Sequence, residues 1–323
     1  MAGWLSDIGS KLGSFIGKRP GSAHVGAFGK HPGWDDHLDD IGLDTEPLIA
    51  AKQYLYVQGI GGVIDAGQWE ALPEGEALAE FQHTFVWMDD RETLVGRLWS
   101  SSDGKGRKKY PMFVSVHLSN RAAPGIPDAA LLLDPLEQSC RATTSPDHIR
   151  SLVGQARFAA VQMLEYPAPH PAPKVEFARA LGIEPESEIA GRIAYAVAND
   201  FAVLESTGVG KVRINLKLGQ FKGQTQHIRL PSDPAQPLAS QRFWREFIAD
   251  DVPAGAPQLY IMPASSPWID IIIGLPTARQ LFCLRAGEKA LPPAHHIPFN
   301  LPDAAKAAAT ARWRSFLAGN GAA

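Results

Sequence analysis

Short stretches rich in β-branched and aromatic residues alternate with polar turns through much of the chain. Residues 84–88, 94–99 and 111–118 follow one another with short connections, which is the pattern of an antiparallel meander. Similar stretches predict six further strands, at residues 24–28, 201–205, 211–218, 224–230, 257–262 and 268–274.

Other stretches repeat apolar residues every three or four positions, which is the period of a helix with one buried face. The predicted helices cover residues 46–60, 76–83, 128–139, 147–165, 187–199, 237–250 and 303–318, and one more begins at Thr277. This mixture predicts an α/β fold with a largely antiparallel central sheet covered by helices, an α/β/α-like sandwich with an elaborated C-terminal half.

One proline-rich run divides the chain. Every second residue of the 167–173 stretch is proline, and such a sequence forms a stiff, extended linker. We therefore expect an amphipathic segment at residues 1–20, an α/β region at 21–166, and a C-terminal α/β region at 167–323 that packs on it.

Composition places the protein among globular proteins. The 323 residues are 45% hydrophobic and 20% charged, with a formal net charge of −3, so general attraction to nucleic acid is not expected. Cys140 and Cys283 lie far apart among apolar neighbours, and we interpret both as reduced core thiols. No run of about eighteen apolar residues predicts a membrane span, and Asp7 interrupts any secretory signal. We expect a cytoplasmic protein.

The N-terminal segment at residues 4–18 has a helical apolar face. The residues on this face are Trp4, Leu5, Ile8, Leu12, Phe15 and Ile16. One interpretation is a helix that binds a partner or lies peripherally on the inner membrane. The other is a terminal helix packed on the protein's own sheet, since four glycines each lower its helicity by roughly 1 kcal/mol.

A charged loop separates the second and third strands of the meander. It places Asp103 beside four cations, namely Lys105, Arg107, Lys108 and Lys109. Two buried strands that hold such a loop would present its charge rigidly. The alternative is a solvated hairpin tip.

An acidic segment follows the first strand. His31 and His37 alternate there with carboxylates, which raises the hypothesis of a metal site, but the spacing matches no established ligand motif. We favour a helix N-terminus, where carboxylates complement exposed amides. No metal is predicted.

The chain shows none of the usual catalytic motifs for nucleotide binding, metalloprotease or serine hydrolase chemistry. The pair His295 and His296 has no nearby acid in the sequence, and we interpret the two residues as surface or core filler. We predict neither an enzyme nor a cofactor. The alternative is a hydrolase whose site combines Ser101, Asp103 and His31.

Two stretches carry a family resemblance. Gly29, Lys30, Pro32 and Asp36 fit a Gly-Lys-x-Pro-x-x-Gly-Asp-Phe turn. Ser101, Asp103, Gly106, Arg107, Tyr110 and Pro111 fit a Ser-x-Asp-x-x-Gly-Arg-x-[Phe/Tyr]-Pro-Leu segment with one inserted lysine. In these motifs, and in Gly274-Leu275-Pro276, the chain resembles the TagF family, also called ImpM, which is associated with bacterial type VI secretion. It departs from the motifs at Asp35, His37 and Met112.

This resemblance implies a cytoplasmic accessory or regulatory protein of the secretion machine. Some members act as post-translational repressors that bind a forkhead-associated scaffold protein rather than catalyse a reaction. We predict that the two motifs meet at one end of the sheet, where Asp36 and Arg107 pair, while Lys105, Lys108 and Lys109 face a protein partner. The alternatives are contacts that only brace the loops, and a peripheral membrane adaptor that uses residues 4–18.

Overall fold

The computed structural model of the protein describes residues 22–119, 129–163, 173–207, 225–298 and 300–319. The predicted N-terminal helix, the predicted strand at 211–218 and most of the proline-rich linker lie outside these residues.

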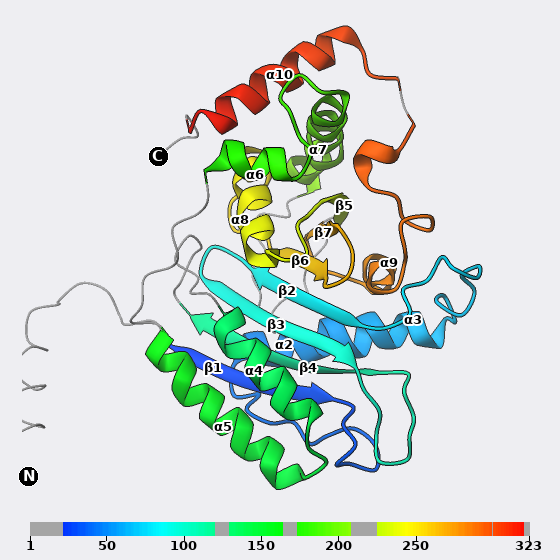
Figure 1. Ribbon diagram of the computed structural model, residues 1–323, viewed down its shortest axis with the longest axis vertical. Coiled ribbons are helices and arrows are strands. Elements are labelled where there is room, and N and C mark those ends of the chain that lie inside the picture. Colours follow the sequence, from blue (N-terminus) through cyan, green and yellow to red (C-terminus); the bar gives the residue numbers. More distant parts are fainter. Residues whose placement is uncertain (1–21, 120–128, 164–172, 208–224, 299, 320–323) are drawn as a thin grey trace, which may run out of the picture.

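Seven strands of the described chain form one sheet in the order β1-β4-β3-β2-β6-β7-β5 (Figure 1). They are β1 (Ala23–Gly29), β2 (Gln82–Met88), β3 (Glu92–Ser100), β4 (Pro111–Ser119), β5 (Gln226–Pro231), β6 (Gln258–Pro263) and β7 (Trp268–Ile273). Every neighbouring pair is antiparallel. The predicted antiparallel sheet covered by helices is confirmed, and so is the meander of β2, β3 and β4.

The junction between the two halves of the chain lies inside this sheet. β2 pairs with β6 from His83↔Pro263 to Met88↔Gln258. The N-terminal half therefore supplies four strands and the C-terminal half three strands to one continuous layer (Figure 1).

Helices cover both faces of the sheet. One face carries α4 (Ala130–Arg141), α5 (Pro146–Met163), α6 (Lys174–Ala180), α7 (Glu188–Thr207), α8 (Pro237–Phe247) and α10 (Asp303–Leu317). The other carries α2 (Glu46–Ala50), a π-helix (Ala51–Ile60), α3 (Gly61–Asp65) and α9 (Ala278–Leu281).

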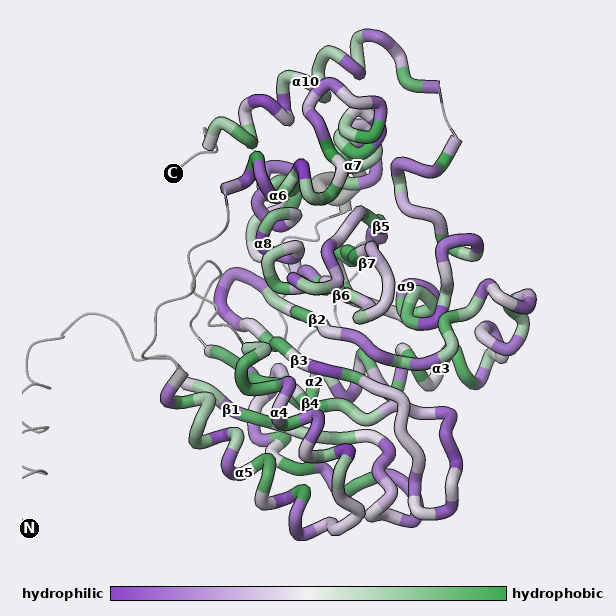
Figure 2. The backbone as a smooth tube through the Cα atoms, in the orientation of Figure 1, coloured by the Kyte–Doolittle hydropathy of each residue, from purple (hydrophilic) through white to green (hydrophobic). Residues whose placement is uncertain are grey.

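Alternation along the strands divides the core between the two faces. Val95 packs in the first core, whereas the adjacent Leu94 packs in the second, as the two-residue period of a strand requires. Figure 2 shows hydrophobic residues along the strands, while the loop between β3 and β4 is mainly hydrophilic.

Two predicted elements are wrong. Residues 76–83 do not form a helix, because their backbone pairs with a remote segment: Leu78 N–H donates to Arg285 O, and Glu76 O accepts from Gly287 N–H. The predicted strand at 201–205 belongs to α7. Its short apolar run is ambiguous by periodicity, and Val197 and Phe201 are buried at the four-residue spacing of a helix.

Other sequence expectations hold. Cys140 and Cys283 are free and buried, and burial raises the pKa of the Cys140 thiol to about 12. Thr277 caps α9. Within the described part of the chain, no helix combines the length and apolar character needed to cross a bilayer.

Candidate functional site

The two motif stretches meet where β1 ends. Gly29 adopts φ 112°, and a Cβ at this position would lie 2.3 Å from the carbonyl oxygen of Pro111. Only glycine combines this backbone conformation with such a close approach. The next residue, Lys30, donates its backbone N–H to the same Pro111 oxygen at 3.1 Å, so the first motif lies directly against the end of the second.

Four charged side chains join the motifs, and we call Lys30, Asp36, Asp103 and Arg107 the charge ring. The buried Lys30 ammonium donates to Asp36 Oδ1 and, at 2.7 Å, to Asp103 Oδ2. Arg107 Nε donates to Asp103 Oδ2 at 2.6 Å, and its Nη2 donates to Asp36 Oδ1 at 3.1 Å. The predicted pairing of Asp36 with Arg107 is confirmed.

Asp103 is the buried centre of the second motif, with 1% of its surface exposed. Its Oδ1 accepts the backbone N–H groups of Lys105 and Arg107, each at 3.0 Å. Burial alone would raise the pKa of this carboxyl, but hydrogen bonds from Lys30 and Arg107 outweigh it and hold the pKa well below its usual range. Asp103 is therefore ionised and fixed in place.

The remaining motif residues lie around the ring. Gly106 turns the loop with φ 79°. Tyr110 packs against His37, with ring centroids 5.4 Å apart. Pro32 and Ser101 line a cavity beside the ring. All ten motif residues are thus brought into one region, while the apolar residues of segment 4–18 lie outside the described chain.

The acidic stretch before α2 is not a helix N-terminus, so that prediction is wrong. α2 begins only at Glu46, and the earlier carboxylates pair with cations instead. The pairs are Asp35 with Lys105, Asp36 with Lys30 and Arg107, Asp39 with Arg150, and Asp40 with Lys52. Cations from the same turn and from other segments therefore neutralise this acidic stretch.

The described residues bring three metal-ligating atoms together at a different place, formed by His227, Asp270 and Cys283. The guanidinium of Arg229 already holds Asp270 there, with Nε 2.8 Å from Oδ1 and Nη2 2.9 Å from Oδ2. A metal ion would face this positive charge at close range, so the cluster is better explained as a core ion pair.

A cavity of about 500 Å³ lies beside the charge ring and includes Ser101 and His31 in its lining. Both ring nitrogens of His31 are engaged: Nε2 lies 3.0 Å from Cys140 O, and Nδ1 accepts the Gly33 N–H at 3.1 Å. Burial lowers the pKa of His31. A general base needs a free lone pair facing its nucleophile, and this geometry gives Ser101 no such base at His31.

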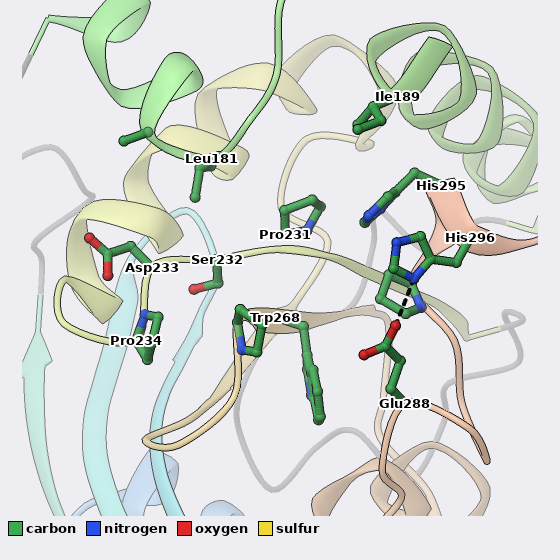
Figure 3. Close-up of a pocket in the computed structure, with 13 residues that line it drawn as sticks. Leu181, Ile189, Pro231, Ser232, Asp233, Pro234, Trp268, Glu288, His295 and His296 are labelled. Atoms are coloured by element: carbon green, nitrogen blue, oxygen red, sulfur yellow. Dashed lines mark hydrogen bonds and ion pairs between the residues drawn. The ribbon is translucent and has the colours of Figure 1, made fainter. Parts of the chain in front are cut away.

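A second cavity, of about 400 Å³, lies in the C-terminal half between the end of β5, α7 and the segment before α10 (Figure 3). His295 and His296 line it, and His296 Nδ1 lies 2.7 Å from a carboxylate oxygen of Glu288 (Figure 3). Burial lowers the pKa of His295 to about 4. None of the motif residues line this cavity.

Several site residues were not identified from the sequence. The burial of Lys30 and its contact with Asp103 were missed, as were Arg141 and Arg285, which reach the first cavity from distant segments. The motif marks Lys30, but nothing in the sequence indicates that this lysine is buried. No motif or pattern marks Arg141 or Arg285.

No protein-family model and no curated protein sequence matches this chain. Among solved structures, the crystal structure of PA0076 from Pseudomonas aeruginosa PAO1 is similar to it, with 17% identity and a TM-score of 0.42. The aligned region covers 86% of this chain and 100% of that chain. A likeness at this level carries no information about the site or its function.

Proposed function

We propose that this protein acts without catalysis, as an accessory or regulatory protein of a bacterial type VI secretion system. It binds another protein through a docking face, which we define as the turn at residues 29–37 and the loop at residues 101–111. The observation that carries the proposal is the charge ring: Lys30 and Asp36 from one motif bond to Asp103 and Arg107 from the other.

The form of the ring supports a docking role. A buried ion pair seldom stabilises a fold more than a well-packed apolar pair would, because desolvation offsets the attraction. It does hold charged loops in one geometry. Lys30 and Asp103 are buried, whereas Arg107 has 54% of its side chain exposed, so the ring fixes the loops from beneath and leaves polar groups on the surface.

The family resemblance supplies the class of partner. We propose a forkhead-associated scaffold protein of the secretion apparatus, which this chain would hold in an inactive state after translation. Regulation of this kind requires a rigid surface and stoichiometric binding rather than a reactive group. The same resemblance supports a cytoplasmic location, which we propose for this protein.

Calorimetric titration of the full chain with the purified forkhead-associated scaffold of the same bacterium tests the proposal. Arg107→Ala removes the outer corner of the ring but leaves the buried Lys30–Asp103 pair, so we expect at least tenfold weaker binding. Arg179→Ala is the matched control, because Arg179 is a comparably exposed arginine that pairs with Glu184, outside the docking face. We expect it to bind within twofold of the unaltered protein.

Exposed ion pairs contribute only about 0–1 kcal/mol, so both variants should keep their unfolding temperatures within a few degrees. If the unaltered protein does not bind the scaffold, the proposed partner is wrong. If Arg107→Ala and Arg179→Ala bind equally well, the docking face is wrong.

A further inference from the structure

The three lysines of the 101–111 loop have different surroundings. Lys105 Nζ lies 3.7 Å from a carboxylate oxygen of Asp35, and Lys109 Nζ lies 3.7 Å from one of Glu70. Lys108 has no carboxylate within ion-pair distance among the described residues. Lys108 is also the lysine of this loop that lines the cavity beside the charge ring. The three lysines are therefore not equivalent parts of one solvated loop.

Two arginines from other parts of the fold complete the lining of this cavity. Arg141, at the end of α4, lies over the ring of Trp99, with its guanidinium carbon 5.3 Å from the ring centroid. Arg285, which follows α9, lies 5.7 Å from the ring centroid of Phe81. Trp99 and Phe81 are almost fully buried, so both guanidinium groups rest on rigid aromatic surfaces.

The charge in the cavity is not balanced. Arg285 donates only to carbonyl oxygens, those of Leu78 at 3.1 Å and Ala79 at 3.3 Å, and no described carboxylate lies within ion-pair distance of it. Arg141 is paired with Glu137 at 2.8 Å. Among the lining residues Glu80 is the single acid, which leaves Lys108 and Arg285 facing one carboxylate.

Neutral hydrogen-bonding groups complete the set. The side chains of Ser101 and Ser102 line the same cavity and have no hydrogen-bond partner within the described chain. Hydroxyl and guanidinium donors are the groups that proteins use to bind carboxylate and phosphoryl oxygens.

We infer that this cavity is an oxyanion pocket, which binds a carboxylate or phosphoryl group carried on an acidic segment of the protein partner. The inference rests on the docking role proposed above and gives the chemistry of the partner at the docking face. The volume of about 500 Å³ accommodates one or two side chains rather than a folded element. The partner therefore inserts an acidic extended segment, and its remaining surface lies over the loop.

Fluorescence anisotropy of a fluorescein-labelled hexaglutamate peptide, titrated with the full chain at low salt, tests the pocket directly. We expect saturable binding that weakens steeply with salt, because the attraction is electrostatic. Lys108→Glu should weaken binding at least tenfold. Lys289→Glu is the matched control, since it makes the same charge change at an exposed lysine outside the cavity, and it should bind within threefold of the unaltered protein.

Competing ligands identify the preferred oxyanion. Displacement of hexaglutamate by inorganic phosphate, or tighter binding of a peptide that carries phosphothreonine, would assign the pocket to a phosphoryl group. Failure of both competitors, with hexaglutamate still bound, would assign it to a carboxylate. Either result supports the inference.

Two results would overturn it. One is the absence of saturable hexaglutamate binding by the unaltered protein up to millimolar concentration. The other is an equal loss on Lys108→Glu and Lys109→Glu, which would show attraction to the whole loop rather than insertion into a pocket. Because both lysines are exposed, circular dichroism should show both variants folded.

The same variants separate this inference from the docking role. If the scaffold binds the unaltered protein and Lys108→Glu equally well, the pocket inference fails while the docking role stands. If the scaffold does not bind at all, the docking role fails, and the hexaglutamate titration still decides whether the pocket exists.

Discussion

The charge ring and the Arg229–Asp270 pair both place an almost fully buried aspartate against cations, but they differ in their surroundings. Asp103 and Asp270 each expose 1% of their surface. Asp270 lies directly across from Arg229 in the β5–β7 register and also contacts His227 at 2.8 Å. The partners of Asp103 come instead from two loops at a sheet end.

The difference lies in what remains at the edge of each cluster. Arg229 also donates to the carbonyl oxygens of Ala286 and Leu291, at 3.1 and 2.7 Å, which ties the segment after α9 to the sheet. The donors of the Arg229 guanidinium are therefore taken up by partners within the fold. The charge ring borders a cavity that contains Lys108 and Arg285, whose charges no described carboxylate pairs. A buried ion pair alone therefore does not indicate a binding surface; unbalanced charge beside it does.

The largest expected effect comes from breaking the Arg229–Asp270 pair. Arg229→Met removes the guanidinium that pairs with the buried Asp270 carboxylate, so we expect about 3–5 kcal/mol less free energy of unfolding. Urea denaturation at pH 7 measures this. The double variant Arg229→Met/Asp270→Leu should recover most of the loss, because no buried charge remains. A single variant as stable as the unaltered protein would contradict this account.

A smaller loss is expected at the charge ring. Lys30→Met removes the buried ammonium, but Arg107 still pairs with Asp103, so we expect about 3 kcal/mol, the lower end for a broken buried pair. Arg107→Ala, which removes an exposed partner, should cost less than about 1 kcal/mol. Equal losses of unfolding free energy in the two variants would show that the buried Lys30 contributes no more stability than the exposed Arg107.

A third effect, smaller than the losses expected for Arg229→Met and Lys30→Met, follows from pH. Burial lowers the pKa of His83, which lies near Asp270 and Arg229, to about 4. The unfolded chain binds the proton near pH 6.5 and the folded chain does not, so protonation favours unfolding. From His83 alone, the free energy of unfolding should fall by about 2 kcal/mol as the pH drops from 7 to 5.

Urea denaturation across this pH range should show a shallower dependence of the unfolding free energy on pH for His83→Gln than for the unaltered protein. The two carboxylates of the charge ring have pKa values lowered by Lys30 and its neighbours. These two carboxylates stabilise the folded state above the ordinary carboxyl pKa. Their stabilisation is lost only at a pH below the range in which protonation of His83 destabilises the fold. An unchanged slope in His83→Gln would rule out this histidine as the cause.

The meander of β2, β3 and β4 could be predicted because residues close together in sequence determine it. Alternating residues and short turns specify β2, β3 and β4 without reference to the rest of the chain. The pairing of β2 with β6 joins residues about 175 positions apart in sequence, and no local pattern specifies such a pairing. The residues around Phe201 were assigned to a strand because a short apolar run fits either period until its packing is known.

The site was predicted only where a motif marked it. Shared motifs placed Asp36 beside Arg107, but lysine is ordinarily exposed, so nothing in the sequence indicated that Lys30 is buried. One local signal was available: an aspartate followed closely by two glycines favours a turn around its own carboxylate, which is what Asp103 forms. Arg141 and Arg285 reach the cavity through the packing of distant helices, which sequence patterns do not encode.

The strand pairing at the middle of the sheet also limits how this protein can be dissected. A fragment that stops at residue 163 would lack β6 and leave the backbone of β2 without partners along one side. Such an open edge associates with any available strand, including another copy of the fragment. Truncated fragments would therefore self-associate or aggregate. The residues that recognise a partner are better mapped by point substitution in the intact polypeptide.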